Sequence, residues 1–302
     1  MRFSSLFVLI LGGFALGAPV AAFAADVPAP SSTNAVSAPL ASPTLERIRK
    51  SGRITFAYRD GARPFSFRER GQVRGYSAEL CLRIAAQVQK RLGLSDLKIE
   101  WAAASAPASI DLVADGKVDA ACGTATMTLG RMQRVDFSLP IYIDGGTVLV
   151  RADAKLAGLA DFNGRKVAVT SGTTTEKALR QRLKAAGATA TVVTVSDGAA
   201  GMALLAKGEV AGYAGDRTML VALRAAAPDS ADYALIAGDF SIEPYALVLP
   251  RNDPDFRLAV NAGLVDIFRS GEIDAIFQHW LAGLGEPSPL LHALIYLNTL
   301  PE

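Results

Sequence analysis

Two turns rich in hydroxyl-bearing and glycine residues carry the parts of a carboxylate-binding site. The first, over residues 122–131, follows an alternating apolar pattern that is typical of a strand and opens a short helix containing Arg131. The second, over residues 170–176, also leads into a helix. Free N–H groups at a helix start bind anions, and a guanidinium adds a bidentate, charge-assisted contact. The sequence therefore predicts a small anion held between two separate parts of the chain.

The composition is that of an ordinary globular protein and argues against several classes of partner. The chain has 302 residues, of which 50% are apolar and 20% are charged, and its formal net charge is +2. It has no block of about five or more basic residues, so neither nucleic acid nor a membrane surface is expected as a partner. The two histidines, His279 and His292, lie outside any ligand-spaced cluster, so no metal site and no cofactor are predicted.

The N-terminus has the pattern of a secretory signal. Arg2 precedes a short apolar run, and an A-x-A cleavage site ends at Ala24. The run is shorter than the roughly 20 residues of a membrane span. We expect a signal peptide over residues 1–24 and a flexible Pro/Ala/Ser-rich leader over residues 25–43. The first cysteine is Cys81, so no lipid anchor is expected, and in a Gram-negative cell the predicted compartment is the periplasm.

Two cysteines are present, Cys81 and Cys122. In an oxidising compartment two cysteines most simply form a disulfide. Cys81 falls in the first long predicted helix, and Cys122 falls at the end of a strand that this helix can cover. The alternative is a pair of buried free thiols, which behave as small apolar side chains.

Strands and helices alternate along the rest of the chain. Strands are expected over residues 53–58, 97–102, 118–123, 145–151, 166–170, 190–195, 210–214 and 244–249. Helices are expected over residues 44–50, 77–92, 110–115, 173–186, 197–207, 217–226, 254–270 and 272–284. This alternation is the signature of mostly parallel sheets flanked by helices.

The alternation restarts in mid-chain, which predicts two lobes of similar plan. The strands at 145–151 and 244–249 bracket the second lobe and are expected to act as paired hinges. The first lobe is then built from residues 44–146 and 247–302, and the second from residues 147–246. The predicted fold class is α/β, with two lobes that each have a mostly parallel sheet flanked by helices. Ligands of open α/β sheets bind beyond the carboxyl ends of strands, so the site is expected where the lobes close on each other.

Several short motifs, in this order and spacing, resemble the family 3 solute-binding proteins of polar amino-acid ABC importers. The resemblance covers residues 44–287. The motifs are Thr44-Leu45-Glu46-Arg47-Ile48-Arg49-Lys50-Ser51-Gly52, Pro64-Phe65-Ser66-Phe67, Gly75-Tyr76-Ser77, Gly116-Lys117-Val118-Asp119, Val135-Asp136-Phe137-Ser138, Thr170-Ser171-Gly172-Thr173-Thr174, Glu243-Pro244-Tyr245 and Ser270-Gly271-Glu272-Ile273. The resemblance is greatest to the glutamate/aspartate-binding branch. It implies a type II periplasmic binding protein, which acts as a monomer, binds an amino acid and delivers it to an ABC permease.

The resemblance also implies roles for individual residues. Arg131, helped by Thr126, is expected to hold the α-carboxylate of the ligand. Thr173 and backbone N–H groups near it, including that of Gly172, are expected to hold the same carboxylate from the other lobe. Asp216 is expected to accept hydrogen bonds from the α-ammonium. An amino-acid zwitterion needs one cation and one anion at a fixed separation, and a desolvated carboxylate without a partner costs several kcal/mol.

The remaining predicted contacts are to the ligand side chain, which determines specificity, or to the α-ammonium. Thr124 is expected to share the α-ammonium. Arg59 is expected to face a distal carboxylate, with Ser105 as a weaker candidate. The chain departs from the acidic-ligand branch at Ala108, where that branch has an arginine, and at Gly198, where it has a histidine. An acidic amino acid is favoured because Arg59 can face a distal carboxylate. Because of the two departures, a longer, neutral or non-standard ligand also fits.

Three of the predicted ligand contacts could instead have a purely structural role, without any contact to a ligand. Arg131 would be a solvated surface charge, and Asp216 would be only the N-cap of the helix at 217–226. Thr173 would cap its own helix, with Glu176 completing a capping box.

The whole chain has two further functional interpretations. It resembles periplasmic cyclohexadienyl dehydratases of the same fold, which need a carboxylic acid in the cleft as a proton donor, either Glu243 or Asp216. It also fits a ligand-sensing partner of a membrane receptor. The intact amino-acid clamp favours transport, so no catalytic residue is predicted.

Overall fold

The computed structural model describes residues 42–301. The predicted signal peptide over residues 1–24 and nearly all of the predicted leader, residues 25–43, lie outside the described residues. No helix within residues 42–301 is long and apolar enough to cross a membrane.

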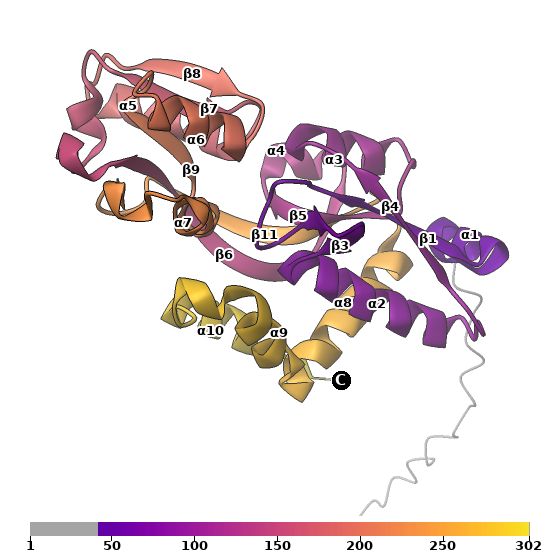
Figure 1. Cartoon of the computed structure of the whole chain (residues 1–302). Coiled ribbons are helices and arrows are strands. Elements are labelled where there is room, and N and C mark those ends of the chain that lie inside the picture. Colours follow the sequence, from indigo (N-terminus) through magenta and orange to yellow (C-terminus); the bar gives the residue numbers. More distant parts are fainter. Residues whose placement is uncertain (1–41, 302) are drawn as a thin grey trace, which may run out of the picture. The chain divides into compact units, whose positions relative to one another are not determined.

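A single mixed sheet runs through the described residues (Figure 1). Its strands are β1 (Arg53–Tyr58), β4 (Lys98–Ala103), β5 (Ala120–Thr126), β6 (Asp136–Arg151), β7 (Lys166–Thr170), β8 (Thr191–Val195), β9 (Gly212–Asp216), β10 (Tyr233–Leu235) and β11 (Ser241–Leu249). The strand order is β4-β1-β5-β11-β6-β9-β7-β8, with β10 paired to β6. Strand β1 is parallel to β4 and β5, and β7 is parallel to β8 and β9. The predicted mostly parallel α/β lobes are therefore present, one on each side of the antiparallel pair β6 and β11.

Helices cover both faces of each half of the sheet (Figure 1). They are α1 (Pro43–Ser51), α2 (Tyr76–Arg91), α3 (Ala106–Ala114), α4 (Leu129–Met132), α5 (Thr174–Ala185), α6 (Gly198–Ala206), α7 (Arg217–Ala226), α8 (Pro254–Ser270), α9 (Glu272–Leu281) and α10 (Pro289–Leu297), with short 3-10 turns η1 (Ala152–Ala154), η2 (Leu159–Phe162), η3 (Ser230–Asp232) and η4 (Ala282–Leu284). We call the half with β4, β1 and β5 lobe 1, and the half with β9, β7 and β8 lobe 2.

Local signals explain where many of these helices begin and end. Helix α8 starts after Asp253, whose side chain accepts a hydrogen bond from the N–H of Phe256, and has Pro254 in its first turn. It ends at Gly271, which has φ of 76°, a left-handed conformation that glycine adopts without steric cost. The predicted boundaries of this helix agree with the structure because its caps lie in the local sequence.

Separate apolar cores support the division into two lobes. In lobe 1, one core packs α2, α8 and α9 against the sheet and includes Ile84 and Leu264. In lobe 2, consecutive residues of β6 enter different cores, Val148 on one side and Leu149 on the other. A strand buried on both faces is expected in a sheet that helices cover on both sides. The boundaries at 146/147 and 246/247 stay a prediction, and Met219 of lobe 2 joins the large core of lobe 1.

The structure joins Cys81 to Cys122 in a disulfide with an S–S distance of 2.00 Å. Cys81 lies on α2 and Cys122 on β5, and both side chains are buried in the lobe 1 core. No free cysteine is present among the described residues. The disulfide therefore attaches a covering helix to the strand that leads into the first hydroxyl-rich turn.

Several parts of the structure differ from the sequence predictions. Helix α3 begins at Ala106, whereas the prediction began at residue 110, and strand β10 was not predicted. Strand β6 begins at Asp136 and has 16 residues, whereas the prediction began at residue 145. A hairpin of β2 (Phe67–Glu69) and β3 (Gln72–Arg74), for which no strands were predicted, forms between β1 and α2. The tail after residue 285 forms α10, which lies against lobe 1. There Leu291 is buried, and the side-chain amide of Asn298 donates to the carbonyl of Pro140 at 2.7 Å.

Candidate ligand-binding site

Arg131 lies on a short helix that follows directly after strand β5. The hydroxyl of Thr128 caps this helix and accepts a hydrogen bond from the N–H of Arg131 at 3.2 Å. The guanidinium turns back and donates from Nη1 to the carbonyl of Thr126 at 2.7 Å. Burial lowers the pKa of Arg131, whereas the nearby charges of Glu243 and Asp216 act in the opposite direction, and an arginine stays charged in any case. The side chain is therefore a half-buried cation over the strand end, not the solvated surface charge of the structural interpretation.

Glu243, on strand β11, lies at the centre of the site. Its side chain is buried, with 1% exposure. The carboxylate accepts hydrogen bonds from the hydroxyls of Ser241 at 2.6 Å, Thr126 at 2.6 Å and Thr174 at 2.7 Å. Thr126 belongs to lobe 1 and Thr174 to lobe 2, so one carboxylate connects the two halves of the sheet. The sequence analysis quoted Glu243 within a family motif and gave it a role only as a proton donor in the dehydratase interpretation.

Asp216, at the end of strand β9, lies in the same region. Its carboxylate accepts hydrogen bonds from the hydroxyls of Thr175 and Tyr245, each at 2.5 Å. It makes no side-chain capping hydrogen bond to helix α7, so the structural interpretation as an N-cap is not what the side chain does. Burial raises the pKa of Asp216, and the negative charge of Glu243 raises it further. A cation bound to Asp216 would offset both the burial of its charge and the repulsion from Glu243.

Thr173 caps helix α5 as its structural interpretation predicts. Its hydroxyl accepts from the N–H of Glu176 at 3.1 Å and donates to the carbonyl of Thr170 at 2.8 Å. The first N–H groups of a helix have no partner within the helix, and those of Thr174 and Thr175 therefore remain for an anion.

The N–H group of Gly172 already has a hydrogen-bond partner within lobe 2. It donates to the carboxylate of Glu176 at 2.8 Å, in place of the N–H of Thr173 that a capping box would use. Gly172 has φ of 71°, and a Cβ there would lie 2.7 Å from Cγ of Pro107 in lobe 1. Glycine is thus required at this position both by the backbone conformation and by the approach of the other lobe.

Arg59 extends from the end of strand β1 toward lobe 2. Its Nη1 donates to the hydroxyl of Thr124 at 3.2 Å. The sequence predictions gave Arg59 and Thr124 to different ends of a ligand, whereas the structure brings the two side chains together. Arg59 also lines two small cavities of about 20 Å³ each, one formed by lobe 1 residues and one by lobe 2 residues that include Asp216.

Ser105 and Gly198 have local structural roles. The hydroxyl of Ser105 caps helix α3 by accepting from the N–H of Ala108 at 3.4 Å, and Ser105 is exposed and lines neither small cavity. A Cβ at Gly198 would lie 2.9 Å from Cδ1 of Leu223, so this leucine fills part of the space that a larger residue would take. A groove of about 520 Å³, which shares Met219 and Leu223 with the lobe 2 cavity, passes Gly198 and Arg63.

The two lobes touch each other in this structure. The hydroxyl oxygens of Thr126 and Thr174 lie 3.1 Å apart across the cleft. Each small cavity in the cleft has room for about one water molecule. Entry of any larger ligand therefore requires that the lobes separate.

The charges of the cleft are two guanidinium groups, Arg59 and Arg131, and two carboxylates, Asp216 and Glu243. Groups of three or more metal-ligating side chains are absent from residues 42–301. Such a cleft can hold a molecule that carries both an anionic and a cationic group. Two α/β lobes, two antiparallel connecting strands and this cleft define the class of two-lobed solute receptors.

Comparison with known proteins identifies the family. The chain belongs to the bacterial extracellular solute-binding proteins, family 3, whose family model matches residues 54–283. It is 30% identical over 239 residues to an L-glutamate/L-aspartate-binding protein of Pseudomonas aeruginosa, an alignment that covers 78% of this chain and 79% of that protein. It is 29% identical to a glutamate/aspartate import solute-binding protein of Salmonella typhimurium, over 80% of this chain and 81% of that protein.

A solved structure gives the same fold. The ancestral amino acid-binding protein AncCDT-1, a precursor of cyclohexadienyl dehydratase, matches with a TM-score of 0.68 and 26% identity, over 80% of this chain and 99% of that chain. The predicted family and fold class are therefore confirmed. The relatives are binding proteins, yet this structural match means that the fold alone does not exclude catalysis.

Proposed function

We propose that this protein captures an amino acid between its two lobes and delivers it to an ABC permease in the inner membrane. The observation that carries the proposal is the neutral cleft, in which two guanidinium groups and two buried carboxylates meet where the lobes touch. The relatives that bind glutamate and aspartate support the ligand class.

The α-carboxylate would bind to Arg131 and to the start of helix α5. Nη1 of Arg131 donates to the carbonyl of Thr126. The other donors of a guanidinium remain for a bidentate contact. From lobe 2, the N–H groups of Thr174 and Thr175 would complete the carboxylate site. We assign Thr173 and Gly172 to the geometry of this turn, because their own polar groups are already engaged.

The α-ammonium would bind to Asp216. Its two oxygens already accept one hydroxyl each, and every carboxylate oxygen has a further lone pair. An ammonium at this place offsets the burial and the repulsion from Glu243 that raise the pKa of Asp216. Thr124 would contribute its hydroxyl beside Arg59.

The ligand side chain would extend toward Arg59, which favours a distal carboxylate. The structure supports Arg59 over Ser105 for this role, since Arg59 lines both cleft cavities and Ser105 caps a helix. The groove past Gly198 and Arg63 leaves room for a side chain longer than that of glutamate. The proposed ligand is an acidic amino acid, with longer acidic analogues as the first alternatives.

Binding would shift an equilibrium between open and closed lobes, and the permease would recognise the closed form. The sequence features of the N-terminus and the family of extracellular binding proteins support export to the periplasm. We propose that the protein acts as a monomer.

The dehydratase alternative needs a carboxylic acid that can release a proton into the cleft. Glu243 accepts three hydroxyl hydrogen bonds, an arrangement that favours a carboxylate over a proton donor. Asp216, the other candidate, has a raised pKa and meets this need better than Glu243. What supports transport over dehydration is that the relatives are solute-binding proteins.

The test is a thermal-shift screen of the ligand-stripped protein against the common amino acids, with glutamate, aspartate and their amides included. A ligand that binds only the native state raises the melting temperature. A rise with acidic amino acids that is lost in Arg131→Ala supports the proposal. If no amino acid raises the melting temperature while prephenate-like acids are turned over, the proposed function is wrong.

A further inference from the structure

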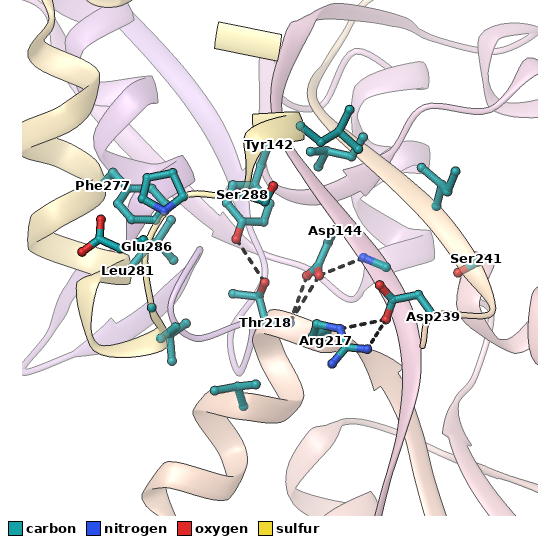
Figure 2. A pocket seen from close by; sticks show the side chains of 18 of the residues that line it. Tyr142, Asp144, Arg217, Thr218, Asp239, Ser241, Phe277, Leu281, Glu286 and Ser288 are labelled. Atoms are coloured by element: carbon teal, nitrogen blue, oxygen red, sulfur yellow. Dashed lines mark hydrogen bonds and ion pairs between the residues drawn. The ribbon is translucent and has the colours of Figure 1, made fainter. Parts of the chain in front are cut away.

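A second and much larger cavity lies beside the hinge strands. Its volume is about 610 Å³, and it shares no lining residue with the two small cleft cavities. Figure 2 shows its parts: Asp144 on strand β6, Thr218 and Arg217 at the start of helix α7, and a wall formed by Phe277, Leu281 and Glu286 of the C-terminal segment. The wall belongs to lobe 1 and helix α7 to lobe 2.

Asp144 is held in a fixed position at this cavity. Its carboxylate accepts hydrogen bonds from the N–H of Gly145 at 2.9 Å and from the N–H of Thr218 at 3.2 Å. The hydroxyl of Tyr245 lies 3.4 Å from the same carboxylate. No lysine or arginine among the described residues forms an ion pair with Asp144.

Counted together with Asp144, the lining has three carboxylates, including Asp239 and Glu286, and two guanidinium groups, so it carries an excess of one negative charge. Arg217 is paired with Asp239 at 2.5 Å, and Nε of Arg182 donates to the carbonyl of Phe240 at 3.0 Å. Glu286, like Asp144, has no ion-pair partner within residues 42–301. The rest of the lining is largely apolar and aromatic, with Tyr142 and Phe277 near the hinge. A carboxylate without a cation beside aromatic rings is an environment that favours an organic ammonium group.

We propose that this hinge cavity is a second binding site, separate from the cleft, for a small organic amine whose ammonium group pairs with Asp144. The apolar body of the amine would lie against Phe277 and Leu281, and Glu286 would add a longer-range attraction. Burial of apolar surface and formation of one ion pair would together provide the affinity.

The hinge cavity is connected to the cleft by a short hydrogen-bond path. The hydroxyl of Tyr245 donates to Asp216 at 2.5 Å and lies beside Asp144. The negative charge of Asp216 is one of the causes, after burial, of the raised pKa of Asp144. If an ammonium binds Asp216, as the proposed function requires, Asp144 ionises more readily and holds an amine more tightly. By reciprocity, the amine then strengthens binding in the cleft by the same factor.

The experiment measures binding of benzylamine by calorimetry at a pH above 7, with benzyl alcohol as the uncharged control. We expect benzylamine to bind the wild-type protein, benzyl alcohol to bind at least about tenfold more weakly, and Asp144→Asn to weaken benzylamine by a similar factor. Val221→Phe, which narrows the cavity without altering a carboxylate, should also weaken binding. Asp115→Asn, an exposed acid of lobe 1 paired with Lys117, should leave it unchanged.

Asp216→Asn distinguishes the hinge cavity from the cleft. Benzylamine that binds in the hinge cavity is retained by this variant, whereas benzylamine that binds in the cleft is lost. Equal binding to wild type and Asp144→Asn, equal binding of amine and alcohol, or no binding of benzylamine at all would overturn the proposal.

The coupling between the hinge cavity and the cleft is tested separately, by titrating benzylamine in the presence of a saturating cleft ligand. If no amino acid binds the cleft, the proposed function fails while the benzylamine result stands by itself.

Discussion

The hydroxyl oxygens of Thr126 and Thr174 lie 3.1 Å apart, although the residues are 48 positions apart in sequence and belong to different lobes. Both hydroxyls also contact the carboxylate of Glu243, which lies on a hinge strand. Contact between the lobes is thus made by neutral hydroxyls around one buried charge. This arrangement links the two lobes across the cleft.

The first prediction concerns this contact. Thr174→Val removes one hydrogen bond to a charged group that forms only when the lobes meet, so the ligand-free protein should shift toward the open form. A loss of about 1 kcal/mol corresponds to a change of about fivefold in the closed-to-open ratio. Small-angle scattering should show a larger radius of gyration. Thr189→Val, which alters a contact within lobe 2 to Asn163, is the control and should leave the radius unchanged.

The second prediction concerns Arg131. Arg131→Ala should weaken every amino-acid ligand by at least about a hundredfold, because it removes a bidentate contact to the α-carboxylate that all of them share. Calorimetric titration measures the effect. Arg134→Ala is the matched control, since Arg134 pairs with Asp111 on the surface and both are exposed. Wild-type affinity in Arg131→Ala would exclude the assigned role.

The third prediction concerns Arg59. Arg59→Gln should weaken glutamate much more than glutamine, because only glutamate carries a distal carboxylate. Arg134→Gln, which removes an exposed pair with Asp111, is the control and should affect the two ligands alike. Competition titrations with both ligands provide the comparison. Equal losses for glutamate and glutamine in Arg59→Gln would show that this arginine does not read the side chain.

The fourth prediction concerns the disulfide. Its two cysteines are 41 positions apart, so breaking it frees a long loop in the unfolded chain. Replacing both cysteines by serine should lower the free energy of unfolding by about 2–5 kcal/mol, as measured by urea titration. Reductant should destabilise the wild type by a comparable amount and leave the serine variant unaffected. A reductant effect on the serine variant would point to another cause.

The fifth prediction concerns pH and Asp144. Burial, and after it the charge of Asp216, raise the pKa of Asp144 from 3.8 to about 7. Between these values the unfolded chain has lost a proton that the folded protein keeps, so the free energy of unfolding falls as pH rises. The titratable groups around Asp144 are Tyr142 on β6, Tyr245 and Glu243 on β11, Asp216 on β9 and Arg217 on α7.

Asp144→Asn should therefore raise the free energy of unfolding at about pH 8 and change it little at about pH 4. Asparagine keeps an oxygen that can accept from the N–H of Thr218. Urea titrations at both pH values measure the difference, with the exposed Asp115→Asn as the control. The same change at both pH values would mean that the effect is not one of ionisation.

Local signals allowed much of the fold to be predicted. Strand β1, strand β7 and helix α7 have the predicted boundaries, because apolar periodicity and the residues at their ends are local. Helix α10 was not predicted. Its apolar residues indicated only a tail that must be buried. Strand β6, against which this helix packs, is more than a hundred positions away in the sequence.

The candidate site was predicted only in part, because local motifs mark some of its residues and distant contacts place the others. Arg131, Asp216 and Arg59 do lie together, as the family motifs indicated. The structural place of Glu243 was missed, because its partner Thr126 lies 117 positions away and no local pattern marks their contact. The hydroxyls of Thr174 and Thr175 lie in the second hydroxyl-rich turn, residues 170–176, but the sequence analysis assigned them no role.

Strand β11 lies between β5 and β6 in the sheet, although it comes much later in the chain than either of them. The first lobe therefore cannot complete its sheet until the last quarter of the polypeptide has been made. A ribosome or a translocation channel would release most of the chain before this strand can be inserted. We expect folding of lobe 1 to finish only after synthesis or export is nearly complete, and a fragment that ends before strand β11 not to form lobe 1.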